Sequence, residues 1–238
     1  MRVGLFFDFD GTLSPLDASP ESAKLGEDLK RALCKLSDEY KIAVISAKDC
    51  WFLKKNVPHF IHGLSCINGG EVIASGYIIL DESLINSSLS CAFKELMEES
   101  SRLGIKVEIK RSILGYIGGL SLNWRDLGSR PAEIENLIVK AESYGLYVVD
   151  HPNLWFVDFY ASRRNKGDSV RILKALLGVD KVVYFGDSHN DIPAFRESNI
   201  SVLVEHNYNR DFNPLYIKYR VRLEELARWL WSVSAFVA

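Results

Sequence analysis

The spacing of hydrophobic residues changes twice along the chain, and the first stretch alternates between strands and helices. Continuous apolar runs at residues 3–9 and 41–47 predict strands that are buried on both faces. Between them, leucines recur at helical spacing on a charged background, at Leu25, Leu29, Leu33 and Leu36. A short helix at 49–57 follows, and the segment 64–73 contains a third strand that ends in Asn68-Gly69-Gly70. Strands that alternate with helices predict parallel βαβ units.

Residues after 72 follow a different pattern, in which strands come in pairs. The predicted elements are a hairpin at 72–80, helices at 87–104 and 130–145, and strand pairs at 105–124 and 146–161. Runs of strands with two helices predict an α+β module over an antiparallel sheet.

The first pattern returns near residue 165. The predicted elements are helices at 166–178 and 190–199 and strands at 181–187 and 200–205. We therefore predict an α/β fold, in which a doubly wound, Rossmann-like parallel sheet is formed by residues 1–72 and 163–238. An α+β cap of residues 73–162 is inserted into it. The apolar segment 226–238 is predicted to be a terminal helix that packs on the core, with a dimer contact as the alternative.

Composition narrows the function classes. The chain has 238 residues, 47% of them hydrophobic and 25% charged, with a net charge of −2. This balance gives no general affinity for nucleic acid or an acidic membrane surface. No apolar run approaches the roughly 20 residues that span a bilayer, and we expect no signal peptide. We predict a cytoplasmic protein, either a monomer or a homodimer.

The four cysteines, Cys34, Cys50, Cys66 and Cys91, form no CxxC pair and lack the spacing of a metal site. We predict that they are reduced and mostly structural, as is usual for cytoplasmic proteins.

Polar side chains follow the predicted parallel strands at the point where each strand ends. Asp8 and Asp10 end the first strand, Ser46 the second and Asp187 a later one, with Asp191 four residues on. Ligands of open parallel sheets gather at these carboxyl ends. Four carboxylates in one place raise one another's pKa unless their charge is compensated. Mg²⁺, which prefers oxygen ligands, would compensate it, and Lys166 supplies a second positive charge.

Each of these residues has an ordinary explanation when it is taken alone. A DxD sequence usually lies in a turn, Ser46 is typical of a capping hydroxyl, and an isolated lysine such as Lys166 is usually on the surface. The segment "GDSHND" could simply begin a helix. The functional interpretation therefore depends on their joint placement at strand ends.

These segments resemble the motifs of the haloacid dehalogenase (HAD) superfamily of phosphotransferases. "DFDGTL" at 8–13 is similar to the first motif and "FGDSHND" at 185–191 to the fourth, and both are specific. "VISA" at 44–47 resembles the second motif, and Lys166 fits the third, which is a lone lysine. The resemblance covers both halves of the split domain.

The place of the insertion resembles the members with an α+β cap between the second and third motifs. These include trehalose-6-phosphate, sucrose-6-phosphate and mannosyl-3-phosphoglycerate phosphatases and eukaryotic-type phosphomannomutases. "DFDGTLSPL", "GLSLNWR" and "FVDFYASRRNKGDSV" resemble the trehalose branch. That branch usually has Ser-Gly-Arg where this chain has Ser46-Ala47-Lys48, and Asn-His-Gly where it has Asn68-Gly69-Gly70. Its fourth motif usually reads GDDxTDE, whereas "GDSHND" is closer to the mannosyl-phosphoglycerate and sucrose-phosphate branches.

The resemblance implies a Mg²⁺-dependent phosphatase of a sugar phosphate or another small phosphoester such as phosphoglycolate. A phosphosugar mutase and a non-catalytic binding module are the alternatives. Asp8 would be the nucleophile, Asp10 the general acid and base, and Ser46 and Lys166 the phosphate ligands. The metal would be held by Asp8, Asp10, Asp187 and Asp191, with Asn190 orienting that set.

Substrate recognition is expected from the cap and its junction with the core. The candidates are Arg111, Asn123, Arg125, Lys110, Asn68 and Glu71. His189 is predicted to be a loop residue because Mg²⁺ prefers oxygen ligands, and Arg163 and Arg164 are predicted to lie at the hinge.

Overall fold

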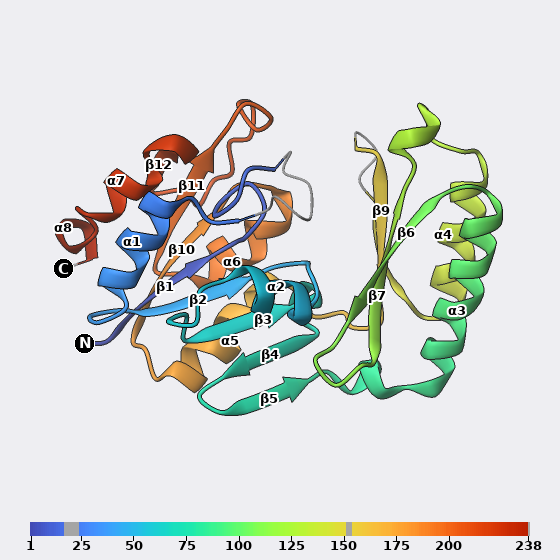
Figure 1. The fold of residues 1–238 in the computed structure, drawn as a ribbon, viewed down its shortest axis with the longest axis horizontal. Helices are drawn as coiled ribbons and strands as arrows, with labels where there is room; N and C mark the ends of the chain where they lie inside the picture. Colours follow the sequence, from blue (N-terminus) through green and yellow to red (C-terminus); the bar gives the residue numbers. More distant parts are fainter. Residues whose placement is uncertain (17–23, 151–153, 238) are drawn as a thin grey trace.

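The computed structural model describes residues 1–16, 24–150 and 154–237. Its larger sheet has eight strands in the order β12-β11-β10-β1-β2-β3-β4-β5 (Figure 1). Their bounds are β1 Val3–Phe7, β2 Lys41–Ile45, β3 Gly63–Cys66, β4 Glu71–Ala74, β5 Tyr77–Leu80, β10 Lys181–Gly186, β11 Ile200–Glu205 and β12 Tyr219–Arg222. The six strands from β12 to β3 are parallel. The predicted parallel α/β core is therefore confirmed.

Helices cover both faces of this sheet because its central strands are apolar on both sides. β1 is buried along its whole length. On one face, Phe6, Ala43 and Tyr184 pack with α5 and α6, and on the other, Leu5, Phe7 and Val44 pack with α1, α2 and α7. The bounds are α1 Glu27–Leu36, α2 Cys50–Asn56, α5 Lys166–Leu177, α6 Ile192–Glu197, α7 Leu226–Leu230 and α8 Ser234–Val237.

The hairpin of β4 and β5 belongs to the large sheet and not to the inserted module, where the sequence placed it. β3 ends just before the predicted strand end at Asn68-Gly69-Gly70, and the chain reverses at η1, Ile67–Gly69, so that β4 pairs antiparallel with β3. β5 then pairs with β4 and forms the edge of the sheet. We therefore propose that the inserted module begins after Leu80 and not at residue 73.

The second sheet is antiparallel, in the order β6-β7-β9-β8, and two helices cover its outer face (Figure 1). The bounds are β6 Lys106–Arg111, β7 Ile117–Asn123, β8 Tyr147–Asp150, β9 Phe156–Tyr160, α3 Ser87–Arg102 and α4 Glu133–Ser143. Strand alternation puts Leu120, Leu122 and Phe159 against the helices. The opposite, more polar face is turned toward the larger sheet.

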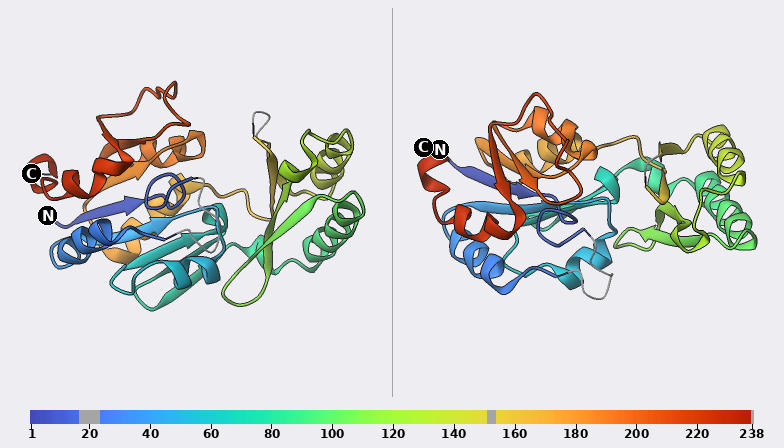
Figure 2. Two further views of the ribbon diagram at one scale, coloured as in Figure 1. Left: turned by 45° about the horizontal axis from the view of Figure 1, so that its top comes forward. Right: turned by 90° about the horizontal axis from the view of Figure 1, so that it is seen from above.

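Two segments join the modules (Figure 2). The first contains η2, Glu82–Ile85, and the second runs from residue 161 to 165. Arg164 of the second segment lies with Nε 2.9 Å from Asp81 Oδ2 of the first. This ion pair ties the two segments together, so the structure supports the hinge position predicted for Arg164.

The C-terminal apolar segment packs on the core, as predicted. Leu226, Leu230 and Val233 are buried, and α7 lies against α1. The segment is not one helix, because residues 231–233 form a turn between α7 and α8. Two short 3₁₀ helices, η3 Arg125–Leu127 and η5 Leu223–Glu225, complete the assignment together with η4, His189–Asp191. Among the described residues, no helix combines the length and apolar character needed to cross a membrane.

Two of the four cysteines form a disulfide, Cys50–Cys66, so the prediction of reduced thiols is wrong for this pair. Cys34 and Cys91 are free and exposed. The pairing follows from the βαβ crossover: α2 runs back along the sheet, so its first residue lies beside the end of β3. Linear spacing does not reveal this proximity. The disulfide also removes the cysteine-based argument for a cytoplasmic location.

Candidate active site

The carboxyl ends of β1 and β10 bring three acidic residues together. The two strands are parallel neighbours, and the Asp8 amide donates a hydrogen bond of 2.8 Å to the Phe185 carbonyl. Carboxylate oxygens of Asp8, Asp187 and Asp191 all lie within 4.8 Å of one another, and all three residues are buried. The predicted convergence of strand-end carboxylates is therefore present in the fold.

Lys166 lies between two of these carboxylates. It is the first residue of α5, whose start is fixed by a capping box between Asn165 and Asp168. Its Nζ lies 2.8 Å from Asp8 Oδ1 and 2.7 Å from Asp191 Oδ1, with the side chain only 1% exposed. Burial alone would lower the pKa of Lys166, but the charges of Asp191 and Asp8 raise it above its ordinary value. This lysine is therefore a fixed positive charge.

Asp191 is surrounded by hydrogen-bond donors of the protein. Its Oδ1 accepts a bond of 2.7 Å from the Tyr184 hydroxyl, in addition to its contact with Lys166. Its Oδ2 accepts bonds of 3.0 Å from the backbone amides of both Asp187 and Ser188. Asp191 thus fixes the loop after β10 and holds Lys166 in place.

The charges of Asp8 and Asp187 are less well compensated. Burial raises the pKa of Asp8 well above its ordinary value, although Lys166 opposes the shift. Burial and the charge of Asp191 raise the pKa of Asp187 to about 8. A buried cluster of carboxylate oxygens with one lysine still lacks positive charge, and a hard divalent cation that prefers oxygen ligands fits this donor set.

The turn after β1 brings Asp10 to the same edge of the sheet. Gly11 has a φ of +79°, and a Cβ at this position would lie 2.4 Å from an oxygen of Asp187, so only glycine fits. Burial raises the pKa of Asp10, while the ammonium groups of Lys48, Lys166 and Lys110 oppose the shift. Asp10 is therefore a buried carboxyl group with a raised pKa, and three ammonium groups stabilise its ionised form.

Ser46 and Asn68 lie on adjoining strand ends. Ser46 is buried, and its Oγ accepts a bond of 3.1 Å from the Lys48 amide. The Asn68 amide donates to the Ser46 carbonyl at 3.2 Å. Asn68 has a left-handed backbone, with a φ of +53°, and is almost fully buried. A backbone hydrogen bond therefore links Ser46, the predicted phosphate ligand, to Asn68, the residue predicted at the junction with the cap.

The polar face of the cap sheet carries a compact ionic cluster. Lys110 Nζ donates to Asp158 Oδ1 at 2.7 Å and to the Tyr160 hydroxyl at 3.0 Å, and all three side chains are buried. Glu108, two residues before Lys110 on β6, shares this face. Its Oε1 lies 3.6 Å from Lys48 Nζ, which belongs to the core loop after Ser46. This pair spans the gap between the two modules.

The other predicted cap residues have more local surroundings. Asn123 is paired with Lys106, so it shares the polar face, but its Oδ1 accepts a bond from the Arg125 amide. Arg125 is exposed, and its side chain has no polar partner in the described part of the chain. Arg111 is exposed at the end of β6, where its guanidinium donates to the Gly115 carbonyl at 3.4 Å. These positions remain predictions for substrate contacts.

Several residues of the site were missed in the sequence. His206 Nε2 lies 2.9 Å from Asp187 Oδ2, and the signal was available because His206 follows the end of β11, a neighbour of β10. Tyr184 is hidden in an apolar run. Lys48, Glu108 and Asp158 could not be identified from the sequence, because their ion pairs join segments that are distant along the chain. His189, in contrast, is packed on Phe212 at a ring distance of 4.4 Å and not on the carboxylates.

Known families match both ends of the chain. The trehalose-phosphatase family matches residues 6–109, and the haloacid dehalogenase-like hydrolase family matches residues 129–209. A protein of Mycobacterium tuberculosis described as an uncharacterized glycosyl hydrolase is 25% identical over 88% of this chain. The chain spans only 16% of the length of that relative.

Solved structures share the whole architecture. A trehalose-6-phosphate phosphatase related protein has a TM-score of 0.75 at 16% identity, covering 98% of this chain and 97% of its own. The C-terminal domain of the Candida albicans trehalose-6-phosphate phosphatase also has a TM-score of 0.75, at 19% identity, covering 100% and 93%. A HAD phosphatase of Bacteroides thetaiotaomicron has a TM-score of 0.66 at 17% identity, covering 99% and 95%.

These structural matches show the fold, whereas each family match covers less than half of the chain. The first matched segment includes the strand ends with Asp8 and Ser46, and the second includes Lys166 at the start of α5 together with Asp187 and Asp191. The comparisons therefore relate the first part of the chain to the trehalose-phosphatases and the later part to the haloacid dehalogenase-like hydrolases.

Proposed function

We propose that this chain is a Mg²⁺-dependent phosphatase that hydrolyses a sugar phosphate resembling trehalose-6-phosphate through an aspartyl-phosphate intermediate. The observation that carries the proposal is the buried cluster of Asp8, Asp187 and Asp191, in which Lys166 contacts Asp8 and Asp191. Phosphoryl transfer requires positioning and charge stabilisation above all, and these residues can supply both.

In this proposal Asp8 is the nucleophile. Its carboxylate attacks phosphorus, an aspartyl-phosphate forms, and the bond to the sugar oxygen breaks. Asp10, whose pKa is raised by burial, protonates the departing sugar oxygen and then deprotonates the water that hydrolyses the intermediate. Lys166 and Ser46 bind phosphate oxygens, and Lys166 also holds Asp8 in place through its contact at 2.8 Å.

The cation would be held by Asp8, Asp187 and the backbone carbonyl of Asp10. Asp191 would act mainly by fixing the loop that carries Asp187, since both of its oxygens accept bonds from the protein. HAD phosphatases generally use Mg²⁺, and when bound it neutralises phosphate charge and orients the group for in-line attack. His206, at 2.9 Å from Asp187, would orient that carboxylate.

The substrate class follows from the chemistry of the cap face. The charges of Lys48, Glu108 and Lys110 all act on Asp10, the residue that would protonate the leaving group. A carboxylate and an ammonium group can accept from and donate to neighbouring hydroxyls, which suits a sugar. An aromatic or aliphatic leaving group has no hydroxyls for these groups to bind.

A phosphate-release screen tests the proposal. The purified protein is incubated with and without Mg²⁺ with trehalose-6-phosphate, sucrose-6-phosphate, mannosyl-3-phosphoglycerate, phosphoglycolate and hexose phosphates. We expect magnesium-dependent release with a sugar phosphate well above the rest, and none from the Asp8→Asn variant. Isomerised product without free phosphate would indicate a mutase, and absence of any turnover would contradict the proposal.

A further inference from the structure

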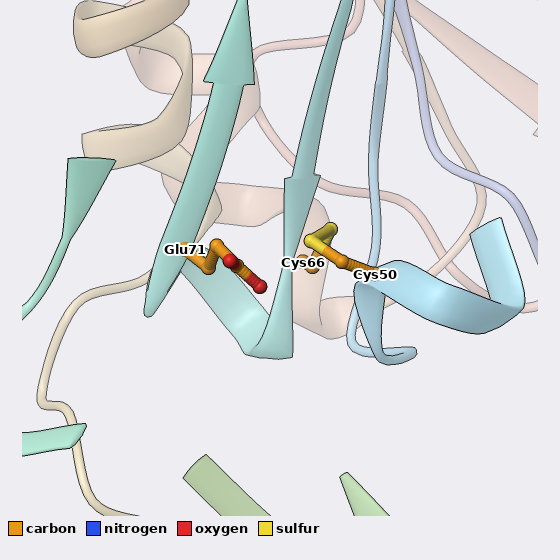
Figure 3. Close-up of side chains that lie close together, drawn as sticks. All are labelled: Cys50, Cys66 and Glu71. Carbon is orange, nitrogen blue, oxygen red and sulfur yellow. A yellow bond between two sulfur atoms is a disulfide. The ribbon is translucent and has the colours of Figure 1, made fainter. Parts of the chain in front are cut away.

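A buried carboxylate lies at the junction of the two modules, away from the strand-end cluster. Glu71, the first residue of β4, is 0% exposed. Its carboxylate lies beside the Cys50–Cys66 disulfide (Figure 3), with one oxygen within 4.8 Å of both sulfur atoms. The disulfide forms an apolar wall that carries no charge, so it does not compensate the charge of Glu71.

The hydrogen-bond partner of Glu71 belongs to the cap. The Ile113 amide, in the loop between β6 and β7, lies 3.0 Å from both carboxylate oxygens. The loop is closed tightly around this amide, because the Ser112 amide donates to the Tyr116 carbonyl and the Ser112 hydroxyl accepts from the Tyr116 amide. Glu71 therefore accepts a hydrogen bond from the structured tip of a hairpin in the opposite module.

The backbone next to Glu71 is also fixed by the cap. Ile67 has a φ of +53°, an uncommon conformation for a β-branched residue. Its side chain packs so closely on Gly118 of β7 that a Cβ there would lie 3.0 Å from it. Strained residues persist where their surroundings hold them. The turn between β3 and β4 and the hairpin of the cap thus form one close-packed contact.

The same hairpin carries the residues of the polar cap face. β6 and β7 are paired from Lys106 opposite Asn123 to Arg111 opposite Ile117, with one register shift between Lys110 and Arg111. Its tip is held by Glu71, and its middle meets the core at Glu108 and Lys48. A shift at the tip would therefore move Glu108 and Lys110 relative to Asp10.

We propose that Glu71 is a positioning residue that anchors the β6–β7 hairpin to the core and so sets the position of the cap face over the substrate. The predicted effect on substrate binding rests on the proposed function. The anchoring of the hairpin by Glu71 does not depend on it. A sugar phosphate that contacts both modules depends on the anchor. A small phosphoester that contacts only the strand-end cluster does not.

The choice of a carboxylate at this place supports an anchoring role. Burial raises the pKa of Glu71 to about 7, the Ile113 amide opposes the shift and Asp49 of the α2 cap adds to it. In the described ranges Glu71 has no ion pair, so its charge is costly there. When Glu71 is ionised, it makes a stronger hydrogen bond with the Ile113 amide than a neutral acceptor would. An apolar residue could not replace this hydrogen bond.

Two substitutions of similar size separate anchoring from packing. Glu71→Met fills the same volume without an acceptor, whereas Glu71→Gln keeps an oxygen for the Ile113 amide. Glu98→Met, on the exposed surface of α3, is the matched control. For each variant, KM and kcat are measured with the best sugar phosphate and with p-nitrophenyl phosphate, and hydrogen exchange is measured across residues 106–123.

We expect Glu71→Met to raise KM for the sugar phosphate about tenfold, with kcat for p-nitrophenyl phosphate within about twofold of wild type. Exchange of the Ile113 amide should accelerate at least about tenfold. Glu71→Gln should restore most of both properties, and Glu98→Met should change neither.

Unchanged KM and unchanged Ile113 exchange in Glu71→Met would overturn the proposal, as would equal losses on both substrates. If the wild-type protein hydrolyses no phosphoester, the proposed function fails, but the exchange experiment still tests the anchoring role of Glu71. In that case, slow exchange of the Ile113 amide in Glu71→Met would show that Glu71 does not anchor the hairpin.

Discussion

The two surfaces that face each other in this enzyme are both charged, but their charges are held in different ways. At the edge of the large sheet, Lys166 and Asp191 are 1% and 0% exposed and their partners are other buried groups. Between the core and the cap, the Lys48–Glu108 pair is 24% and 46% exposed and spans a gap of 3.6 Å. The first arrangement is fixed by the core, whereas the second depends on where the cap lies.

This difference separates the chemistry from the selectivity. Buried ionic groups that are already oriented can stabilise charge without reorganising. Exposed charges on a movable module can adapt to a leaving group and exclude water when the module closes. Changes at the sheet edge should therefore affect all substrates, and changes on the cap face should affect only substrates that reach the cap.

The largest effect is expected from Lys166→Met. Removing the ammonium group leaves Asp8 and Asp191 buried without their partner, and breaking a buried pair typically costs about 3–5 kcal/mol. The kcat should fall by about 10³-fold or more with every substrate, including p-nitrophenyl phosphate. Urea unfolding and steady-state kinetics measure both effects, with Lys174→Met on the same helix as the control. Full activity in Lys166→Met would show that the sheet edge is not the catalytic centre.

The disulfide joins α2 to the end of β3, and its loss should weaken the core without abolishing the chemistry. Cys50 and Cys66 are 16 residues apart, and a loop of this size gives about 3 kcal/mol in the chain-entropy account. The double variant Cys50→Ser/Cys66→Ser should lose about this much unfolding free energy. Replacing the free pair Cys34 and Cys91 is the control, and equal stability of the two double variants would contradict the expectation.

The pH dependence of stability tests the burial of Glu71. Its folded pKa is about 7 against an ordinary value of 4.5, so ionisation disfavours the folded state. Relative to Glu71→Gln, the wild-type protein should lose stability as the pH rises from about 4.5 to about 7, by up to about 3 kcal/mol. The difference in unfolding free energy between the two proteins is measured at pH 5 and pH 8. A difference that is independent of pH would show that Glu71 is solvated.

The smallest effect is expected on the cap face. Glu108→Gln should raise KM for the sugar phosphate about fivefold and leave p-nitrophenyl phosphate unaffected, because a single exposed charge contributes about 1 kcal/mol. Arg125→Ala tests a predicted substrate contact that is exposed and has no polar side-chain partner in the described residues, and its effect on KM should be the smaller of the two. A larger effect of Arg125→Ala than of Glu108→Gln would reverse the assignment of the sugar-binding face.

The same contrast explains what the sequence could predict. Asp8, Asp10, Ser46, Lys166, Asp187 and Asp191 follow buried strands or begin a helix, so their convergence is a consequence of parallel topology. His206 could have been found by the same rule. The residue order along β6, Glu108-Ile109-Lys110, also predicts two polar groups on one face, but not which surface they meet.

The remaining features depend on contacts between distant segments. The Cys50–Cys66 pairing follows from the direction of α2 relative to β3, and the place of the β4–β5 hairpin follows from the reversal at Ile67 and Asn68. The glycines after Asn68 predict the end of the third strand, but not that the chain returns as β4 antiparallel to β3. The link between Glu71 and Ile113 joins residues 42 apart.

The central claim is that Asp8 forms a covalent bond to phosphorus. The most direct test is to quench the enzyme during turnover of its best sugar phosphate with Mg²⁺, reduce the protein with borohydride and map the peptides by mass spectrometry. Borohydride converts an aspartyl-phosphate to homoserine, so the account predicts homoserine at residue 8 and unmodified aspartate at residues 10, 187 and 191. Phosphate release with no reduction at residue 8, or with reduction at another aspartate, would contradict it.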